Sequence, residues 1–217
     1  MKIAYKLTDS EMKTFRGFQW ELGKWYKITE KGDLCSSSWF HFYSDPLVGM
    51  FLNPAHADIG NPRLFRAEVE GNFIDDNGTK CGYSRAKLIE ELPVPQISPV
   101  QRIRFAILYA KEVYKEKEWN EWADNWLSGK DRTKESATIV AYAAKITAES
   151  AAESAFYAAK SAVSAFYAAK SAESAFYAAK STENAFYTAK SAVSAAESTT
   201  KNKKIDLIRI AQKAMEE

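Results

Sequence analysis

Charged and aromatic side chains in the first 70 residues have types and an order that could support chemistry. An arginine comes first, an aromatic strand that ends at Ser44 follows, and a strand with two glutamates comes last. A guanidinium can hold phosphate oxygens through two parallel hydrogen bonds, and a carboxylate can stabilise positive charge that develops in a transition state. These residues form one candidate catalytic set: Arg16, His41, Tyr43, Glu68 and Glu70.

The order of this set resembles that of ADP-ribosyltransferases. The resemblance implies that Arg16 holds the phosphates of a dinucleotide and that Glu70, the second glutamate, stabilises the charge at the ribose. The same residues also have a structural interpretation, in which Glu68 and Glu70 share one solvated strand face and His41 is a satisfied strand histidine. An ADP-ribosyltransferase-like enzyme in the N-terminal domain is therefore the alternative function.

The function that we favour from the sequence is non-enzymatic capture of a nucleotide or small anion. Aromatic rings can stack on a base, while arginines hold phosphate. The candidate ligand-binding residues are Arg16, Trp20, Trp25, Trp39, Tyr43, Arg63 and Arg66. No cofactor is predicted. No metal site is predicted either, because two histidines and two distant cysteines do not give zinc-type spacing.

The length and charge of the chain limit the classes of function. The 217 residues fit two structural units, and the composition changes near Pro99. A net charge of +2 argues against bulk electrostatic binding of nucleic acid. Two cysteines indicate a reducing compartment, and the sequence shows neither a signal peptide nor an apolar run of about 18 residues. We therefore expect a soluble, cytoplasmic protein with no membrane span.

Short apolar runs between turn residues predict a small, mainly antiparallel β domain at residues 1–92. One short helix is expected at 47–52, capped by Ser44 and ended before Pro54. A hairpin turn is expected at 76–78, and residues 86–92 fit either a strand or a helix. The expected strands lie at 2–7, 15–20, 24–28, 39–43 and 64–70.

Several motifs of this domain resemble a small domain of unknown function that is common in phage and prophage proteins. They are Phe15-Arg-Gly-Phe-Gln, Gly23-Lys-Trp-Tyr, Phe40-His-Phe, Asp45-Pro and Ala67-Glu-Val-Glu. The resemblance covers about residues 1–92 and implies a viral or prophage origin. It suggests a counter-defence role in the host cell cytoplasm, in which the protein captures a nucleotide signal or blocks a host defence protein.

The C-terminal half is expected to be helical throughout. A Pro-rich linker at 93–99 precedes an amphipathic helical region at 100–135, and a closing helix is expected at 201–217. An apolar helix, the turn Trp126-Leu-Ser-Gly and the run Ala141-Tyr-Ala-Ala resemble the arrangement in bacterial proteins labelled as immunity proteins, over about residues 100–199. The fold class is therefore α+β, with the small β domain followed by an all-α region.

Residues 136–200 carry a ten-residue repeat rich in alanine. Small residues recur every three or four positions, so a helix could approach a neighbour closely along this stripe. The recurring lysines stand beside glutamates, which indicates a solvated face rather than a basic ladder for nucleic acid. We favour one long helix that forms a homo-oligomer and carries the β domain as a head. A bundle that folds back within one chain is the alternative.

Overall fold

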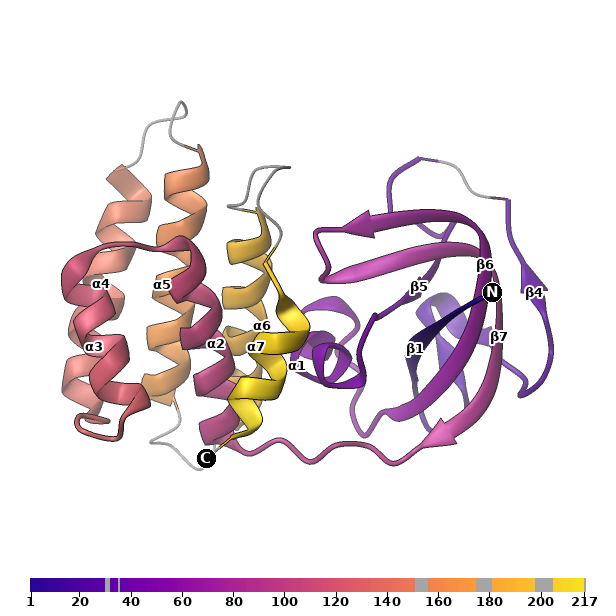
Figure 1. Cartoon of the computed structure of the whole chain (residues 1–217), viewed down its shortest axis with the longest axis horizontal. Helices are drawn as coiled ribbons and strands as arrows, with labels where there is room; N and C mark the ends of the chain where they lie inside the picture. Colours follow the sequence, from indigo (N-terminus) through magenta and orange to yellow (C-terminus); the bar gives the residue numbers. More distant parts are fainter. Residues whose placement is uncertain (30–31, 35, 151–155, 175–180, 198–204, 217) are drawn as a thin grey trace. The chain divides into compact units, whose positions relative to one another are not determined.

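The structure is a computed structural model that describes residues 1–29, 32–34, 36–150, 156–174, 181–197 and 205–216. It contains two compact units, Met1–Gln96 and Ile97–Glu217, and each is described by itself. The first unit holds the strands and one α-helix, and the second unit holds six α-helices in its described part (Figure 1). The α+β fold class is confirmed.

An antiparallel sheet forms the N-terminal unit. Its two longest strands, β6 (Arg63–Asp76) and β7 (Lys80–Leu92), form a hairpin. Strand β1 (Lys2–Thr8) pairs with the other edge of β6. Two short strands, β4 (Tyr26–Lys27) and β5 (Phe40–Phe42), pair with different parts of β7. Just after β5, Tyr43 exchanges two backbone hydrogen bonds of 2.8 Å with Tyr5 of β1. The sheet therefore closes on itself through β1, β6, β7 and β5.

Alternation along β6 separates a buried face from a charged face. Phe65, Ala67 and Val69 are buried in the core of the unit, while the residues between them point to the other face. The strands predicted at 2–7 and 64–70 are confirmed, and residues 86–92 form a strand rather than a helix. The predicted turn at 76–78 is also confirmed, since Asn77 and Gly78 both have positive φ, as a tight hairpin turn requires.

The strand predicted at 15–20 is wrong. The chain instead forms a small hairpin of β2 (Lys13–Thr14) and β3 (Phe18–Gln19) around a 3₁₀ turn, η1 (Phe15–Gly17). Arg16 and Gly17 reverse the chain with φ values of 58° and 74°. The side chain of Asp9 accepts hydrogen bonds from the backbone N–H groups of Glu11 and Lys13, at 2.9 and 2.7 Å, and so fixes the start of the hairpin.

The single helix of this unit differs from its prediction at both ends. Helix α1 (Pro46–His56) is capped by Asp45, not by Ser44, because the Asp45 carboxylate accepts from Leu47 N at 2.8 Å. The helix also continues through Pro54. Its C-terminal end is held by Asn53, whose side chain exchanges hydrogen bonds with the backbone of Ile59.

The second unit is a helical bundle. Helix α2 packs against α5, α6 and α7, and α3 packs against α2 and α4. The helical region predicted at 100–135 contains α2 and α3, which separate where Tyr114 leaves helical geometry with ψ of 120°. None of the described helices has both the length and the apolar content that a membrane crossing requires. The helices are α2 (Pro99–Val113), α3 (Lys117–Leu127), α4 (Lys134–Ser150), α5 (Phe156–Ser174), α6 (Ser181–Glu197) and α7 (Leu207–Met215).

The alanine-rich tract folds back on itself, so the favoured long helix is wrong and the alternative bundle is correct. Helix α5 packs between α4 and α6, and Figure 1 shows the three side by side. Ala165, Ala168 and Ala172 are fully buried, and Ser171 lies 2.9 Å from Thr188 of α6. The stripe that we expected to contact a second copy is therefore covered within one chain. Other positions of the stripe, including Ala155, Ala175 and Ala178, lie outside the described residues.

Candidate functional site

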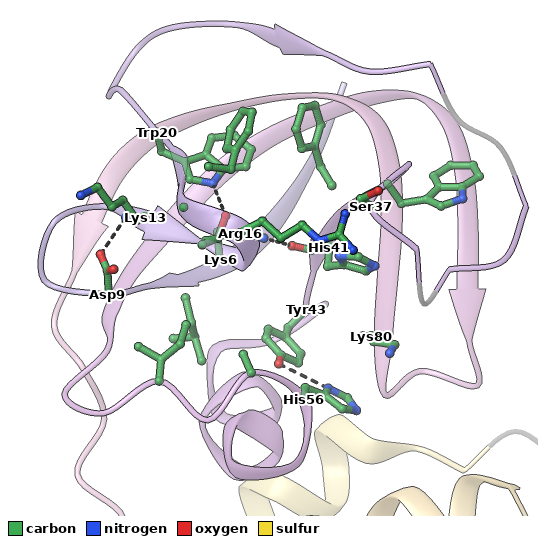
Figure 2. A pocket seen from close by; sticks show the side chains of 18 of the residues that line it. Lys6, Asp9, Lys13, Arg16, Trp20, Ser37, His41, Tyr43, His56 and Lys80 are labelled. Atoms are coloured by element: carbon green, nitrogen blue, oxygen red, sulfur yellow. Dashed lines mark hydrogen bonds between the residues drawn. The ribbon is translucent and has the colours of Figure 1, made fainter.

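A pocket of about 900 Å³ lies in the N-terminal unit, next to the core residues Trp20 and Phe40 (Figure 2). It is bounded by the β2–β3 hairpin, by β1 and β5, by the segment that leads into β5, and by the end of α1. Its charged lining residues are four cations and one carboxylate, which give a formal charge of +3 with neutral histidines. These five residues are Lys6, Lys13, Arg16, Lys80 and Asp9.

Lys6 is the most unusual group in the pocket, because it is a buried cation. Only 8 % of the residue is exposed, and its ammonium donates one hydrogen bond, to the carbonyl oxygen of His41 at 2.7 Å. It also lies over the rings of Trp20 and Phe42, at 5.5 and 5.2 Å from their centroids. Within the described part of the chain, no carboxylate forms an ion pair with Lys6. Burial lowers the pKa of Lys6 to about 8.

His41 lies between two of the pocket lysines. Its Nε2 is bonded to the carbonyl oxygen of Leu34, so the proton of the neutral ring is on Nε2 and Nδ1 carries a lone pair. Burial lowers the pKa of His41, and the positive charges of Lys6 and Lys80 lower it further. The ring is therefore a neutral hydrogen-bond acceptor at neutral pH.

Tyr43 and His56 form a neutral pair at the end of the pocket next to α1. The Tyr43 hydroxyl lies 3.3 Å from His56 Nδ1, and the rings are stacked with their planes 8° apart. Burial raises the pKa of Tyr43 above its ordinary value and lowers the pKa of His56 to about 3. Neither side chain offers a charge to a ligand at neutral pH.

Acidification should destabilise the N-terminal unit through His56. In the folded state this residue stays neutral down to pH 3, whereas an unfolded histidine takes up a proton below pH 6.5. The free energy of unfolding then falls with decreasing pH, by about 2 kcal/mol between pH 6.5 and pH 5. Urea denaturation at both pH values measures this loss. The variant His56→Gln keeps an acceptor for Tyr43 and should show a smaller loss, and an equal loss would contradict the assignment.

Arg16 brings a guanidinium to the pocket from the tip of the small hairpin. Its side chain points toward Ser37 and His41 (Figure 2). The backbone at Arg16 has φ of 58°, a conformation that costs a residue with a Cβ atom on the order of 1 kcal/mol. The hairpin thus places an arginine where a glycine would fit with less strain.

The aromatic lining residues have two different roles. Trp20 is only 1 % exposed and its indole donates to Thr14 Oγ1 at 3.1 Å, so it forms part of the wall. Phe18 is 36 % exposed, and Trp39 is half-buried with its indole bonded to Gly32 O. The rings of Phe18 and Trp39 are therefore the ones that a ligand ring can reach.

The structure brings together only part of each predicted residue set. Arg16, Trp20, Trp39, His41 and Tyr43 line the pocket. The other predicted residues do not line it: Trp25, Arg63, Arg66, Glu68 and Glu70.

Cross-strand ion pairs explain where the predicted arginines and glutamates lie. Glu68 pairs with Lys87 at 2.6 Å, Arg66 pairs with Glu90 at 2.7 Å, and Arg63 pairs with Glu91 at 2.5 Å. Glu70 pairs with Arg85, whose guanidinium lies over the Trp25 ring at 4.3 Å from the centroid. Glu68 and Glu70 alternate with core residues and so face away from the pocket. The candidate catalytic set is therefore divided between two faces of the sheet.

Several lining residues were not among the sequence candidates: Lys6, Lys13, Phe18, His56 and Lys80. One of them carries a signal that the sequence could have supplied. Ala4, Lys6 and Thr8 share one face of β1, and a lysine between small residues on a buried face is unusual. The other four come from separate elements, and only the folding of the β2–β3 hairpin, helix α1 and the β6–β7 turn brings them to the pocket.

Residues 2–99 match a family described as a domain of unknown function, DUF7666. This match covers the N-terminal unit together with its pocket and ends where α2 begins. Comparison with curated proteins and comparison with solved structures give no match. The family description assigns no activity, so the function has to be argued from the chemistry of the pocket.

Proposed function

We propose that the N-terminal unit binds a phosphorylated nucleotide in its pocket and does not transform it. The observation that carries this proposal is the buried ammonium of Lys6. Burying a charge without an opposite charge is unfavourable, and protein interiors therefore pair such groups. Among the described residues Lys6 has one carbonyl partner and no carboxylate. A phosphate in the pocket would supply the missing negative charge.

The remaining lining residues fit the other parts of a nucleotide. Arg16 can bind a phosphate with two parallel hydrogen bonds. Phe18 and Trp39 offer ring faces on which a base can stack, and base–aromatic stacking is worth about 1–3 kcal/mol. Cationic and aromatic groups from separate elements therefore converge on one cavity, as ligand sites commonly require.

Binding fits the pocket better than catalysis. The candidate glutamates lie on the other face of the sheet, and Asp9 is the carboxylate among the described lining residues. Its Oδ1 is already occupied by two backbone N–H groups of the hairpin. A transferase of the predicted kind needs a carboxylate beside the ribose, and among the described lining residues only Asp9 has one, which helps to fix the hairpin through Oδ1.

A counter-defence role extends this proposal. The resemblance of residues 1–92 to phage and prophage domains suggests that the ligand is a nucleotide signal of the host, and that the protein lowers its free concentration. Sequestration needs affinity and no turnover, which agrees with the cationic and aromatic groups that line the described part of the pocket.

Isothermal titration of the full chain with AMP and ADP tests the proposal. We expect saturable binding that Arg16→Gln weakens by about tenfold or more, because a hydrogen bond to a charged group contributes about 1.5–3 kcal/mol. The matched control is Arg66→Gln. Arg66 is an arginine of the same unit that pairs with Glu90 outside the pocket, so this variant should bind like the wild type.

Two results would overturn the proposal. The first is the absence of any heat of binding with both nucleotides at millimolar concentration. The second is an equal loss of affinity in Arg16→Gln and Arg66→Gln, which would show that the overall charge of the unit, and not the pocket, attracts the nucleotide.

A further inference from the structure

We infer that the pocket has two phosphate subsites, one on each side of His41, and that its ligand carries two phosphate groups separated by a ribose. Cyclic dinucleotides and nucleoside 3′,5′-bisphosphates share this chemistry. The inference rests on the proposed nucleotide binding and goes further by naming the class of nucleotide.

The closed sheet fixes the spacing of the two lysines that define the subsites. Lys6 lies on β1 and Lys80 begins β7, with β5 between these strands. Tyr5 pairs with Tyr43, and Phe42 pairs with Cys81, so Lys6 shares a row with Phe42 and Cys81, and Lys80 lies one residue outside this row. Neighbouring strands are about 4.8 Å apart, which places the two lysine backbones about 10 Å apart.

The two ammonium groups are held apart and do not converge on one point. The hydrogen bond to His41 O fixes Lys6 Nζ above Trp20 and Phe42. Lys80 Nζ lies 4.0 Å from Asp76 Oδ2, which draws it toward β6, on the side of β7 away from β5. Figure 2 shows the two lysines on opposite sides of His41. The two ammonium groups therefore offer separate positions for phosphate.

Groups between the lysines suit the sugar that links two phosphates. His41 Nδ1 carries a lone pair and has no hydrogen-bond partner in the described part of the chain, so it can accept from a ribose hydroxyl. Arg16 points toward Ser37 and His41, so its guanidinium lies between the two subsites and can contact a phosphate in either one.

The size and charge of the pocket agree with such a ligand. Its volume of about 900 Å³ lies near the upper end of the usual range for ligand pockets, about 300–1,000 Å³. The charged residues that line the pocket carry a formal charge of +3 with neutral histidines. Two phosphates match this charge better than one.

Titration calorimetry on the full chain with four ligands tests the inference. The ligands are AMP, ADP, adenosine 3′,5′-bisphosphate and cyclic di-AMP. We expect at least one of the last two to bind about tenfold or more tightly than both AMP and ADP. The tighter of these two ligands shows whether the pocket takes a nucleoside 3′,5′-bisphosphate or a cyclic dinucleotide. Lys80→Gln should remove this gain and leave the affinity for AMP, which occupies the Lys6 side, unchanged.

The control is Lys87→Gln, since Lys87 pairs with Glu68 outside the pocket and should not affect any of the four ligands. The two-subsite inference fails if ADP binds as tightly as both ribose-separated ligands. It also fails if Lys80→Gln weakens AMP as much as it weakens the tighter of those two. In these cases AMP still binds, and the proposed function stands. If no nucleotide binds, both proposals fail.

Discussion

Replacing Lys6 with methionine should stabilise the N-terminal unit and weaken its binding of nucleotides about a hundredfold. The lowering of the Lys6 pKa from 10.5 to about 8 measures how much the folded state disfavours this charge. At about 1.4 kcal/mol per pKa unit, the cost is about 3 kcal/mol at pH 7. Methionine has a similar length, no charge and a good fit beside aromatic rings, so Lys6→Met should recover much of this cost.

The pH dependence of this gain follows from the direction of the shift. The folded pKa of Lys6 is lowered, so the cost is complete below pH 8 and disappears as the pH rises past 10.5. Thermal unfolding at pH 7 should therefore show a midpoint raised by about 10 °C in Lys6→Met, and the difference should shrink at pH 10. Calorimetry at pH 7 should show the accompanying loss of nucleotide binding, by about a hundredfold.

A lysine on the same strand provides the control. Lys2 is exposed and lies over the Phe73 ring on β6, at 5.2 Å from its centroid. Lys2→Met removes the same charge from β1 without a change in burial, so neither stability nor affinity should change by much. A destabilised Lys6→Met protein, or one that still binds nucleotides at full affinity, would show that Lys6 is a structural residue and not part of a binding site.

The sequence predicts the strands in which apolar and charged residues alternate. It does not predict which residues line the pocket. Phe65, Ala67 and Val69 stand at every second position of β6, and this period alone assigns them to one face. The same period could have shown that Glu68 and Glu70 face away from that core. Arg16 is different, since its place depends on a left-handed turn that an arginine rarely adopts.

In the alanine-rich tract, the sequence predicts the helices but does not predict where they end or what they pack against. Its composition predicts helix, and residues 156–174 and 181–197 are helical. The position of the turns was not predictable, because neither glycine nor proline occurs after Gly129. Small residues allow close packing with any neighbour, so the stripe alone does not distinguish a second copy of the chain from the chain itself.

Replacing Trp119 with alanine should destabilise the helical unit by about 3–5 kcal/mol, the usual cost of removing a large buried aromatic side chain. Trp119 on α3 is 3 % exposed and packs edge-on against Tyr114, with ring centroids 5.7 Å apart. Its indole donates to the carbonyl oxygen of Ala165 on α5 at 3.3 Å. This contact spans 46 residues of the chain, and it forms because the alanine-rich tract folds back onto α3.

Denaturation of the full chain at two protein concentrations, about a hundredfold apart, distinguishes the folded-back bundle from an oligomer of long helices. In the bundle, the loss in Trp119→Ala is the same at both concentrations, because mass action does not affect packing within one chain. The control is Tyr142→Ala on α4, where a large ring is 65 % exposed and its removal should change the free energy of unfolding by less than about 0.5 kcal/mol. A wild-type stability that rises with protein concentration would contradict the bundle, because the buried alanine stripe would then require a second chain.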